Sequence, residues 1–308
     1  MINPSDLYEI VDESGLPDAP VLVLGLSGYV DAGHAGSGLV DQFRTALDHR
    51  IVARFDADLL VDYRARRPRI SFVEDHFEEY EAPEIVLRAM TDVTGRQFLL
   101  LDGPEPDGMW DRFTTAVTEL IQHFGVRLVV GMHGIPMAVP HTRPLGMTVH
   151  ANRPELVSVV NPWQGKVSVP SNLAALLELR LATIGVDSVG YVAHVPHYLA
   201  ESEYPDASLS LATALGQATG LELPVVALTE SAEATRAMVA EQVSENEEVQ
   251  RVVGALEVQY DAYIGGEERG NLIAESSAVP DAEQIGDELE RFLAGLPGED
   301  GGSGPGTS

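Results

Sequence analysis

Short apolar runs alternate with segments of helical spacing along most of the chain. The clearest unit opens with the apolar residues Val21 to Leu24, continues through five glycines between positions 25 and 38, and ends in an amphipathic segment at 39–47. This order indicates a buried strand, a glycine-rich turn and a helix. Further strand-like runs stand at 7–10, 51–55, 70–73, 85–93, 98–101, 128–130, 147–150 and 186–195. Helical spacing recurs at 109–124, 171–181 and 207–219.

This alternation predicts a three-layer α/β/α sandwich around a mixed, mostly parallel sheet, followed by C-terminal helices. Ser231 is the expected N-cap of a long helix reaching Tyr263, and the polar run at 244–248 marks a break in its apolar face. Pro280 and Asp281 are expected to start another helix. We therefore predict one domain over 1–297, with an α/β core at 18–228, a helical segment at 229–297 and a disordered tail at 298–308.

Composition narrows the possible partners and chemistry. The net charge of −29 over 308 residues repels phosphate backbones and anionic lipids, which argues against nucleic-acid and membrane-surface binding. The absence of cysteine excludes disulfides, thiolate catalysis and cysteine-ligated metals. The N-terminal residues do not have the pattern of a signal peptide, and no apolar run is long enough to span a membrane. We expect a cytoplasmic protein.

The glycine-rich turn has two interpretations. Backbone amides of the turn around Gly28 and Gly33, together with the following helix N-terminus, can hold an anion. The glycine spacing matches neither nucleotide-binding fingerprint, and Asp31 would oppose a phosphate. The alternative is close packing of helix on strand, with Asp31 as the helix cap.

Three loops rich in proline, histidine, arginine and acids directly follow predicted strands: 102–110, 131–144 and 195–205. In a parallel sheet these loops would meet the glycine-rich turn at one edge. The expected cluster is Glu105, Asp107, His141, Arg143 and His197. Each pair also has a structural interpretation, in which Arg143 forms an ion pair with Glu105 or Asp107.

Complete catalytic and metal-binding motifs are missing. Neither Ser27 nor Ser37 lies in the G-x-S-x-G pattern of a hydrolase, and no H-E-x-x-H occurs. The nearest metal-ligand sets are His194 and His197 with Glu201 and Glu203, and a second set of His133, His141 and His150. Pro196 interrupts the first set, so capping and loop hydrogen bonds are the simpler roles. We expect no metal and no cofactor, and the motifs name no catalytic residue.

At these loops the sequence resembles the PAC2 family, named for the eukaryotic proteasome assembly chaperone 2. The similarity spans about 18–262, and the acidic C-terminal helices resemble the bacterial, actinobacterial-type branch. The matching segments are Gly28-Tyr-Val-Asp31-Ala-Gly33, Gly103-Pro-Glu105-Pro-Asp107 with Trp110 and Phe113, Pro140-His141-Thr-Arg143-Pro144, and Val195-Pro196-His197-Tyr198 with Tyr204-Pro205. The resemblance implies a fold similar to that of nucleoside phosphorylases, a tendency to oligomerise and no established reaction. It also implies a chaperone function in proteasome assembly.

Two hypotheses follow. The first is a non-enzymatic, homo-oligomeric assembly or interaction protein of the proteasome-assembly-chaperone type, with itself and proteasome subunits as partners. The second is a small-ligand-binding protein or a phosphorylase- or hydrolase-like enzyme, with its site at the glycine-rich turn and the His/Arg/acid loops. The second hypothesis requires an open pocket there, and a pocket filled by the protein's own side chains would argue against it.

Overall fold

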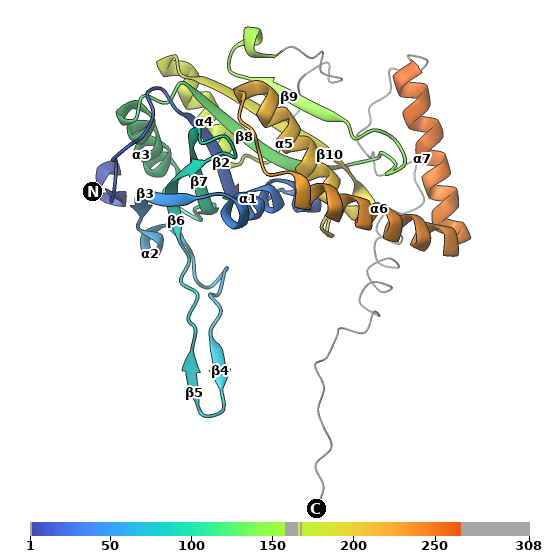
Figure 1. Ribbon diagram of the computed structural model, residues 1–308, viewed down its shortest axis with the longest axis horizontal. Helices are drawn as coiled ribbons and strands as arrows, with labels where there is room; N and C mark the ends of the chain where they lie inside the picture. Colours follow the sequence, from blue (N-terminus) through green and yellow to red (C-terminus); the bar gives the residue numbers. More distant parts are fainter. Residues whose placement is uncertain (1, 158–165, 167, 266–308) are drawn as a thin grey trace, which may run out of the picture.

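The structure is a computed structural model that describes residues 2–157, 166 and 168–265 (Figure 1). Short strands and helices alternate along the first two thirds of the chain, and two long helices follow. The strands are β1 (Tyr8–Ile10), β2 (Val21–Ser27), β3 (His49–Phe55), β4 (Ser71–Val73), β5 (His76–Glu78), β6 (Ile85–Thr91), β7 (Gln97–Pro104), β8 (Leu128–Met137), β9 (Met147–Ala151) and β10 (Asp187–Pro196). The α-helices are α1 (Ala35–Ala46), α2 (Ala57–Leu60), α3 (Trp110–His123), α4 (Leu173–Ile184), α5 (Pro205–Thr219), α6 (Val226–Glu245) and α7 (Glu247–Gly265), and the 3-10 turns are η1 (Pro4–Leu7), η2 (Ala32–His34), η3 (Pro154–Leu156) and η4 (His197–Leu199).

The main sheet has eight strands in the order β1-β3-β6-β7-β2-β8-β10-β9. The three-layer α/β/α sandwich with a mixed sheet is confirmed. The parallel share is smaller than expected, because only the three central pairs are parallel and the other four are antiparallel. The physical reason lies in the connections: a short turn joins β6 to β7, and no helix long enough for a parallel crossover lies between β3 and β6.

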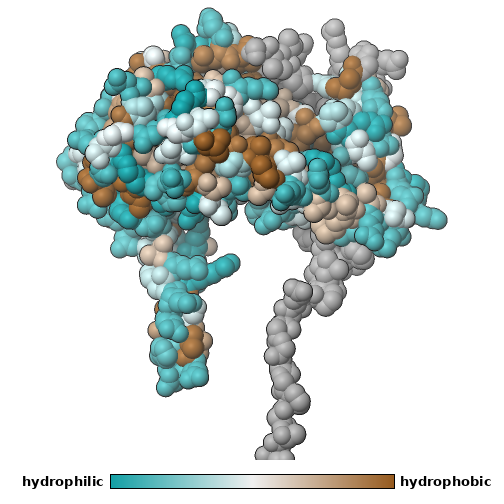
Figure 2. All heavy atoms as spheres, in the orientation of Figure 1, coloured by the Kyte–Doolittle hydropathy of each residue, from teal (hydrophilic) through white to brown (hydrophobic). Residues whose placement is uncertain are grey.

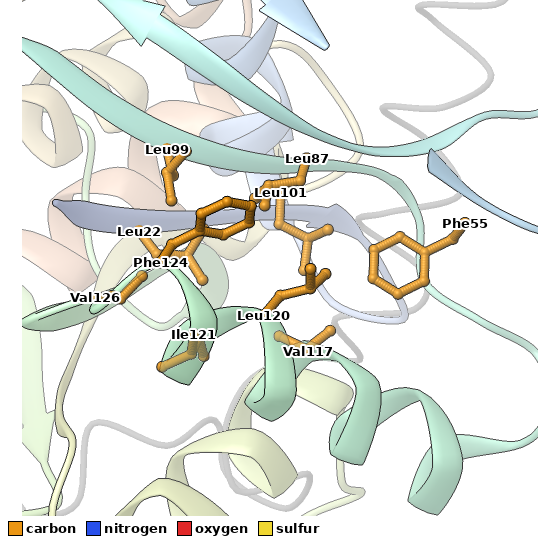
Figure 3. Close-up of a pocket in the computed structure, with 10 residues that line it drawn as sticks. All are labelled: Leu22, Phe55, Leu87, Leu99, Leu101, Val117, Leu120, Ile121, Phe124 and Val126. Atoms are coloured by element: carbon orange, nitrogen blue, oxygen red, sulfur yellow. The ribbon is translucent and has the colours of Figure 1, made fainter. Parts of the chain in front are cut away.

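Alternating side chains of the central strands pack under helices on both faces of the sheet. Val21 and Val23 of β2 belong to the apolar cluster beneath α1 and α5, whereas Leu22 and Leu24 belong to the cluster beneath α3 and α4. Figure 3 shows side chains of α3 pointing at those of β2, β6 and β7 around a void of about 10 Å³ with an entirely apolar lining. A void of this size is a packing defect of the core and offers no room for a ligand.

A two-stranded hairpin, β4 paired with β5, projects from the body between β3 and β6 (Figure 1). The strand expected at 70–73 is confirmed as β4. Within the described residues it pairs with β5, which was not predicted, and not with a strand of the main sheet. Phe72 and Phe77 face each other across the hairpin with ring centroids 5.0 Å apart. They remain 62% and 66% exposed, and the hairpin stands clear of the body in Figure 2.

Several local boundaries differ from the expectations. The loop expected at 131–144 begins seven residues later, at 138, because β8 continues to Met137 in a parallel pairing with β10. The helix expected at 171–181 begins at Leu173, and Asn172 caps it by accepting the Ala175 amide. The helix expected from Ser231 begins at Val226.

The break expected at 244–248 is confirmed at Asn246, whose side chain accepts the amides of Glu248 and Val249 at the start of α7. The helix expected at 280 and the tail at 298–308 lie outside the described residues. Within those residues, no helix has both the length and the apolar character required to cross a membrane.

Candidate functional site

The glycine-rich turn places Asp31 against the N-terminus of α1. One carboxylate oxygen accepts the amides of Gly36 and Gly134, at 2.8 and 3.1 Å, and the other accepts the Ser37 amide and hydroxyl, both at 2.8 Å. The amides that could hold an external anion are therefore occupied by a carboxylate of the chain itself. The geometry matches the capping interpretation of Asp31.

Gly33 joins this turn to the loop after β10. Its backbone has φ +67°, and its amide and carbonyl bond to Ala200 and Tyr204 at 2.7 and 2.9 Å. A Cβ atom at position 33 would stand 2.9 Å from the Cβ of Tyr204 and 3.1 Å from a methyl group of Val195. Only glycine fits this contact, so the turn and the 195–205 loop do meet, as expected, through packed backbone.

Gly28 and Glu105 come together on the opposite face, beneath α4. Glu105 is 6% exposed, and its carboxylate accepts the amide of Leu173 at the N-terminus of α4. A Cβ atom on Gly28 would lie 2.9 Å from the same carboxylate. Glu105 thus caps α4 and fills most of the space at the glycine turn, leaving a cavity of about 40 Å³ that Tyr29 and His133 also line.

Asp107 lies apart from the other expected residues. Its carboxylate accepts the Asp62 amide and an Arg66 N–H, both at 2.8 Å, and its own amide bonds to Leu60. These contacts hold the base of the segment between β3 and β6 that carries the β4–β5 hairpin. Asp107 therefore positions the hairpin, and its hydrogen bonds do not reach the loops at 131–144 and 195–205.

His141 and His197 meet at a residue that the sequence did not single out as a site residue, Tyr198. The phenol oxygen accepts the His141 backbone N–H at 2.8 Å and lies 2.7 Å from its Nδ1. Both imidazoles stand edge-on to the Tyr198 ring, with centroids 5.9 and 5.3 Å away. Within the described residues, neither buried ring nitrogen of His197 has a hydrogen bond of ordinary geometry.

Burial controls the ionisation of this trio. Burial lowers the pKa of His141, and the charge of Glu257 offsets part of this shift. Burial also lowers the pKa of His197, and the Met137 backbone offsets part of that shift. Burial also raises the pKa of Tyr198. All three side chains are consequently neutral near pH 7, and the cluster is a packed polar core beneath α7.

Arg143 attaches the 131–144 loop to α7. Its guanidinium donates to both carboxylate oxygens of Asp261, at 2.8 and 2.7 Å, and to Glu257 at 3.1 Å. Tyr260 adds a hydrogen bond to the Pro144 carbonyl. The ion pair expected for Arg143 is therefore real, but its partners lie on α7 and are neither Glu105 nor Asp107. Sequence spacing carries no signal for this pairing across more than a hundred residues.

Three further polar residues gather on the α4 side of the sheet. His150 on β9 lies 3.0 Å from Glu178 of α4, and its ring covers Gly190, where a Cβ would stand 2.2 Å from it. Burial lowers the pKa of His133, and the charge of His150 lowers it further. His150 and His133 appeared in the sequence only as metal candidates, and Glu178 was not identified. The described part of the chain contains no group of three or more such ligands arranged for a metal.

The eight expected residues thus lie in five places. Asp31 and Gly33 form the turn above α1, Gly28 and Glu105 lie under α4, and His141 and His197 flank Tyr198. Asp107 binds the base of the hairpin, and Arg143 binds α7. The loops converge, but their polar side chains bond mainly to the chain's own backbone and helices.

A family model described as the PAC2 family matches residues 25–243, well over half of the chain. The chain belongs to the PAC2 family. Among solved structures, the Mycobacterium tuberculosis unknown-function protein Rv2714 is 44% identical, with 84% of this chain and 92% of that one covered and a TM-score of 0.79. A protein of unknown function from Corynebacterium glutamicum ATCC 13032 is 37% identical, with 85% and 99% covered and a TM-score of 0.80.

A less similar solved structure is that of a proteasome-assembly chaperone homologue. The Mycobacterium tuberculosis proteasome-assembly chaperone homologue Rv2125 is 24% identical, with 76% of this chain and 99% of that chain covered and a TM-score of 0.69. This similarity shows a shared PAC2 fold. Among curated proteins, none matches the chain.

Proposed function

We propose that this PAC2 protein is a non-enzymatic interaction protein that works as a homo-oligomer, with proteasome subunits as its partner class. The observation that carries the proposal is the β4–β5 hairpin, which presents apolar side chains to solvent. Ile70, Phe72, Phe77 and Tyr80 are each at least half exposed, at 50%, 62%, 66% and 56%. Exposed apolar clusters of this kind mark protein–protein contacts.

The hairpin has physical features that suit association with a second copy. A two-stranded hairpin is marginally stable by itself, so contacts with a partner would stabilise it. Its root carries the exposed Arg67 and Arg69, and its tip carries the exposed Glu74 and Asp75. Two hairpins packed antiparallel would bring opposite charges together, which offsets part of the repulsion between two chains of net charge −29.

The candidate site supports the non-enzymatic half of the proposal. The cavity at the glycine-rich turn measures about 40 Å³, far below the several hundred Å³ of ordinary metabolite pockets. Glu105 fills that space while it caps α4. The carboxylate of Asp31 takes the amides that an anion would need. The proteasome as partner class rests on the fold shared with the proteasome-assembly chaperone homologue.

A second candidate function keeps a specific observation in its favour. The carboxylate of Glu178 holds Nδ1 of His150, which is the arrangement that orients an imidazole as a general base. His133, beside it, lines the small cavity under α4. A ligand-binding protein, or a phosphorylase- or hydrolase-like enzyme, would use His150 and Glu178. A nucleoside that raises the melting temperature of the wild type but not of His150→Gln would favour this second function.

The proposed function is tested by affinity capture with purified proteasome α and β subunits. We compare the wild type with a Phe72→Ser/Phe77→Ser variant and with Glu78→Ser, a control at an exposed polar position of the same hairpin. Capture by the wild type and the control, reduced in the double variant, supports a hairpin-mediated interaction. Equal capture by all three proteins places the contact elsewhere, and absence of capture by the wild type rejects the proteasome as the partner.

A further inference from the structure

A cavity of about 380 Å³ opens on the other side of the sheet from the Glu105 cavity, beside α1. It lies where β2 and β7 end, the position at which α/β sheets usually bind ligands. A second cavity of about 370 Å³ adjoins it and shares Asp41, Arg44 and Arg88. This region could not be identified from the sequence, because its residues come from five separate elements, β2, α1, β3, β6 and β7.

A buried ion pair forms the floor of the cavity. Asp102 and Arg88 are 2% and 7% exposed, and Arg88 donates from Nε to Asp102 at 3.0 Å. Burial raises the pKa of Asp102, against the charges of Arg88 and Arg44. One guanidinium with this geometry compensates the buried carboxylate, so a second cation is not required for folding.

Arg44 nevertheless reaches the same place from α1. Its Nε lies 3.7 Å from the second oxygen of Asp102, beyond hydrogen-bond distance, and its side chain is half exposed. Within the described residues, Arg44 makes no side-chain hydrogen bond, and Arg88 makes only the one from Nε. The remaining N–H groups of both guanidiniums therefore have no hydrogen bond to an acceptor of the described chain. They make only ion-pair contacts of 3.7–4.0 Å, to Asp102, Asp41 and Glu84, at the wall of a large cavity.

The two acidic side chains nearest to these arginines, apart from Asp102, do not form close hydrogen bonds with them. Glu84 forms its closest ion pair with Arg54, and it stands 4.0 Å from Arg88. Asp41 is 74% exposed and 3.8 Å from Arg44. The hydroxyl of Ser27 also lines the cavity and is exposed.

We propose that this cavity binds a small anion with a phosphate or carboxylate group, gripped by Arg44 and Arg88. Several oxygens on one anion fit the several forked donors of two guanidiniums. Asp102 is a positioning residue that aligns both arginines. This site does not depend on the proposed interaction function. Ala82 and Glu84, which follow the hairpin in the chain, line the cavity, but Phe72 and Phe77 do not.

The test is isothermal titration of the full chain with inorganic phosphate and, separately, with malonate, at constant ionic strength set by chloride. We expect saturable binding of at least one anion. Tighter binding of phosphate assigns a phosphorylated ligand class, and tighter binding of malonate assigns a carboxylate class. Absence of saturable binding by both anions overturns the proposal.

Arginine variants show where the anion binds. Arg44→Gln removes no hydrogen bond from the folded chain and should weaken binding about tenfold or more, the effect of losing charge-assisted hydrogen bonds. Arg127→Gln, at an exposed position before β8, should bind as the wild type does. Unchanged affinity in Arg44→Gln overturns the proposal.

Arg88→Gln alone leaves Asp102 buried without its partner and can fail to fold. The double variant Arg88→Gln/Asp102→Asn replaces both charges with neutral amides. The glutamine is shorter than arginine, but its amide nitrogen stands where Nε of Arg88 donates, so it can keep the buried hydrogen bond. With the fold verified by circular dichroism, we expect this variant to lose binding. Wild-type affinity in the folded double variant contradicts the assignment.

Discussion

The glycine-rich turn and the β4–β5 hairpin differ in whether their side chains contact the chain itself or face solvent. In the turn, Asp31 accepts four hydrogen bonds from the chain itself. In the hairpin, the rings of Phe72 and Phe77 contact each other and are otherwise largely exposed. The sequence of the turn resembles a binding site, but its hydrogen bonds are satisfied internally. The sequence of the hairpin shows only one strand, at 70–73, and no sign of a site, but the hairpin leaves apolar surface exposed.

This difference separates groups that stabilise the fold from groups available to a partner. A polar group whose hydrogen bonds are all internal gains little from a ligand, and its loss costs stability. An exposed apolar group contributes little to folding, and it gains free energy when a partner covers it. Variants of both regions test this difference, because the first should lose stability and the second should lose association.

The largest effect is expected at Asp31. Asp31→Ala leaves the Gly36, Ser37 and Gly134 amides without their acceptor, so we expect the free energy of unfolding to fall by about 2–4 kcal/mol. Urea denaturation measures it. Asp41→Ala, at an exposed position on the same helix, should change stability by less than about 0.5 kcal/mol. Equal stabilities of the two variants would show that the turn is not a structural cap.

Acid should weaken the fold through its buried histidines. Burial lowers the pKa of His194 from 6.5 to about 4, so the unfolded chain binds this proton first as the pH falls. The associated loss of stability is absent above about pH 6.5, grows as the pH falls and levels off below about pH 4, where it reaches roughly 3 kcal/mol. Urea denaturation at pH 7.5 and pH 5 measures the difference.

The matched variants identify the residue responsible. His194→Gln keeps a partner for the Thr148 hydroxyl, which lies 2.8 Å from Nε2, and it should reduce the slope of stability against pH. The buried His133, His141 and His197 account for the slope that remains. His76→Gln, on the exposed hairpin, should leave the slope unchanged. A wild-type slope in His194→Gln would mean that other groups cause the acid sensitivity.

A smaller, local effect is expected at Arg143. Arg143→Gln removes the hydrogen bonds to Asp261 and Glu257, so α7 should open more often while the core stays intact. Hydrogen exchange should accelerate in α7 and remain unchanged in β2 and β8. Arg251→Gln, at an exposed position of α7, is the control. Unchanged exchange in α7 would show that apolar contacts alone hold the helix.

The sequence predicted the core better than the site. Apolar runs predicted β2, β7 and β10, because these central strands are buried on both faces. Helical spacing predicted α3, because one face of this helix is buried. The antiparallel direction of the outer strands was not predicted, because strand direction depends on the connecting segments, which show no periodicity. The hairpin partner His76–Glu78 has three exposed residues and no apolar alternation to reveal it.

The sequence predicted which loops of the candidate site lie together, but it did not predict which side chains bond to each other. The loops meet because strands that end at one edge must bring their following segments together. The sequence could not assign Arg143 to α7, or Asp107 to the hairpin base, since each carboxylate and guanidinium has many acceptable partners at long range. The cavity at Arg44 and Arg88 was missed because each arginine looks like an isolated polar position in its own element.

The smallest effect on folding is expected at the hairpin. Phe72→Ser/Phe77→Ser removes side chains that are mostly exposed, so the free energy of unfolding of the separated chain should change by no more than about 0.5–1 kcal/mol. Its effect should appear instead in association, where each aromatic ring can cover a large apolar area.

The most direct test is the mass in solution, measured by light scattering for the wild type, the double phenylalanine variant and the Glu78→Ser control. One chain has a mass of 33.1 kDa. We expect a multiple of that mass for the wild type and the control, and a shift toward 33.1 kDa for the double variant. A monomeric wild type, or an oligomer that the double variant leaves intact, would contradict self-association through the hairpin.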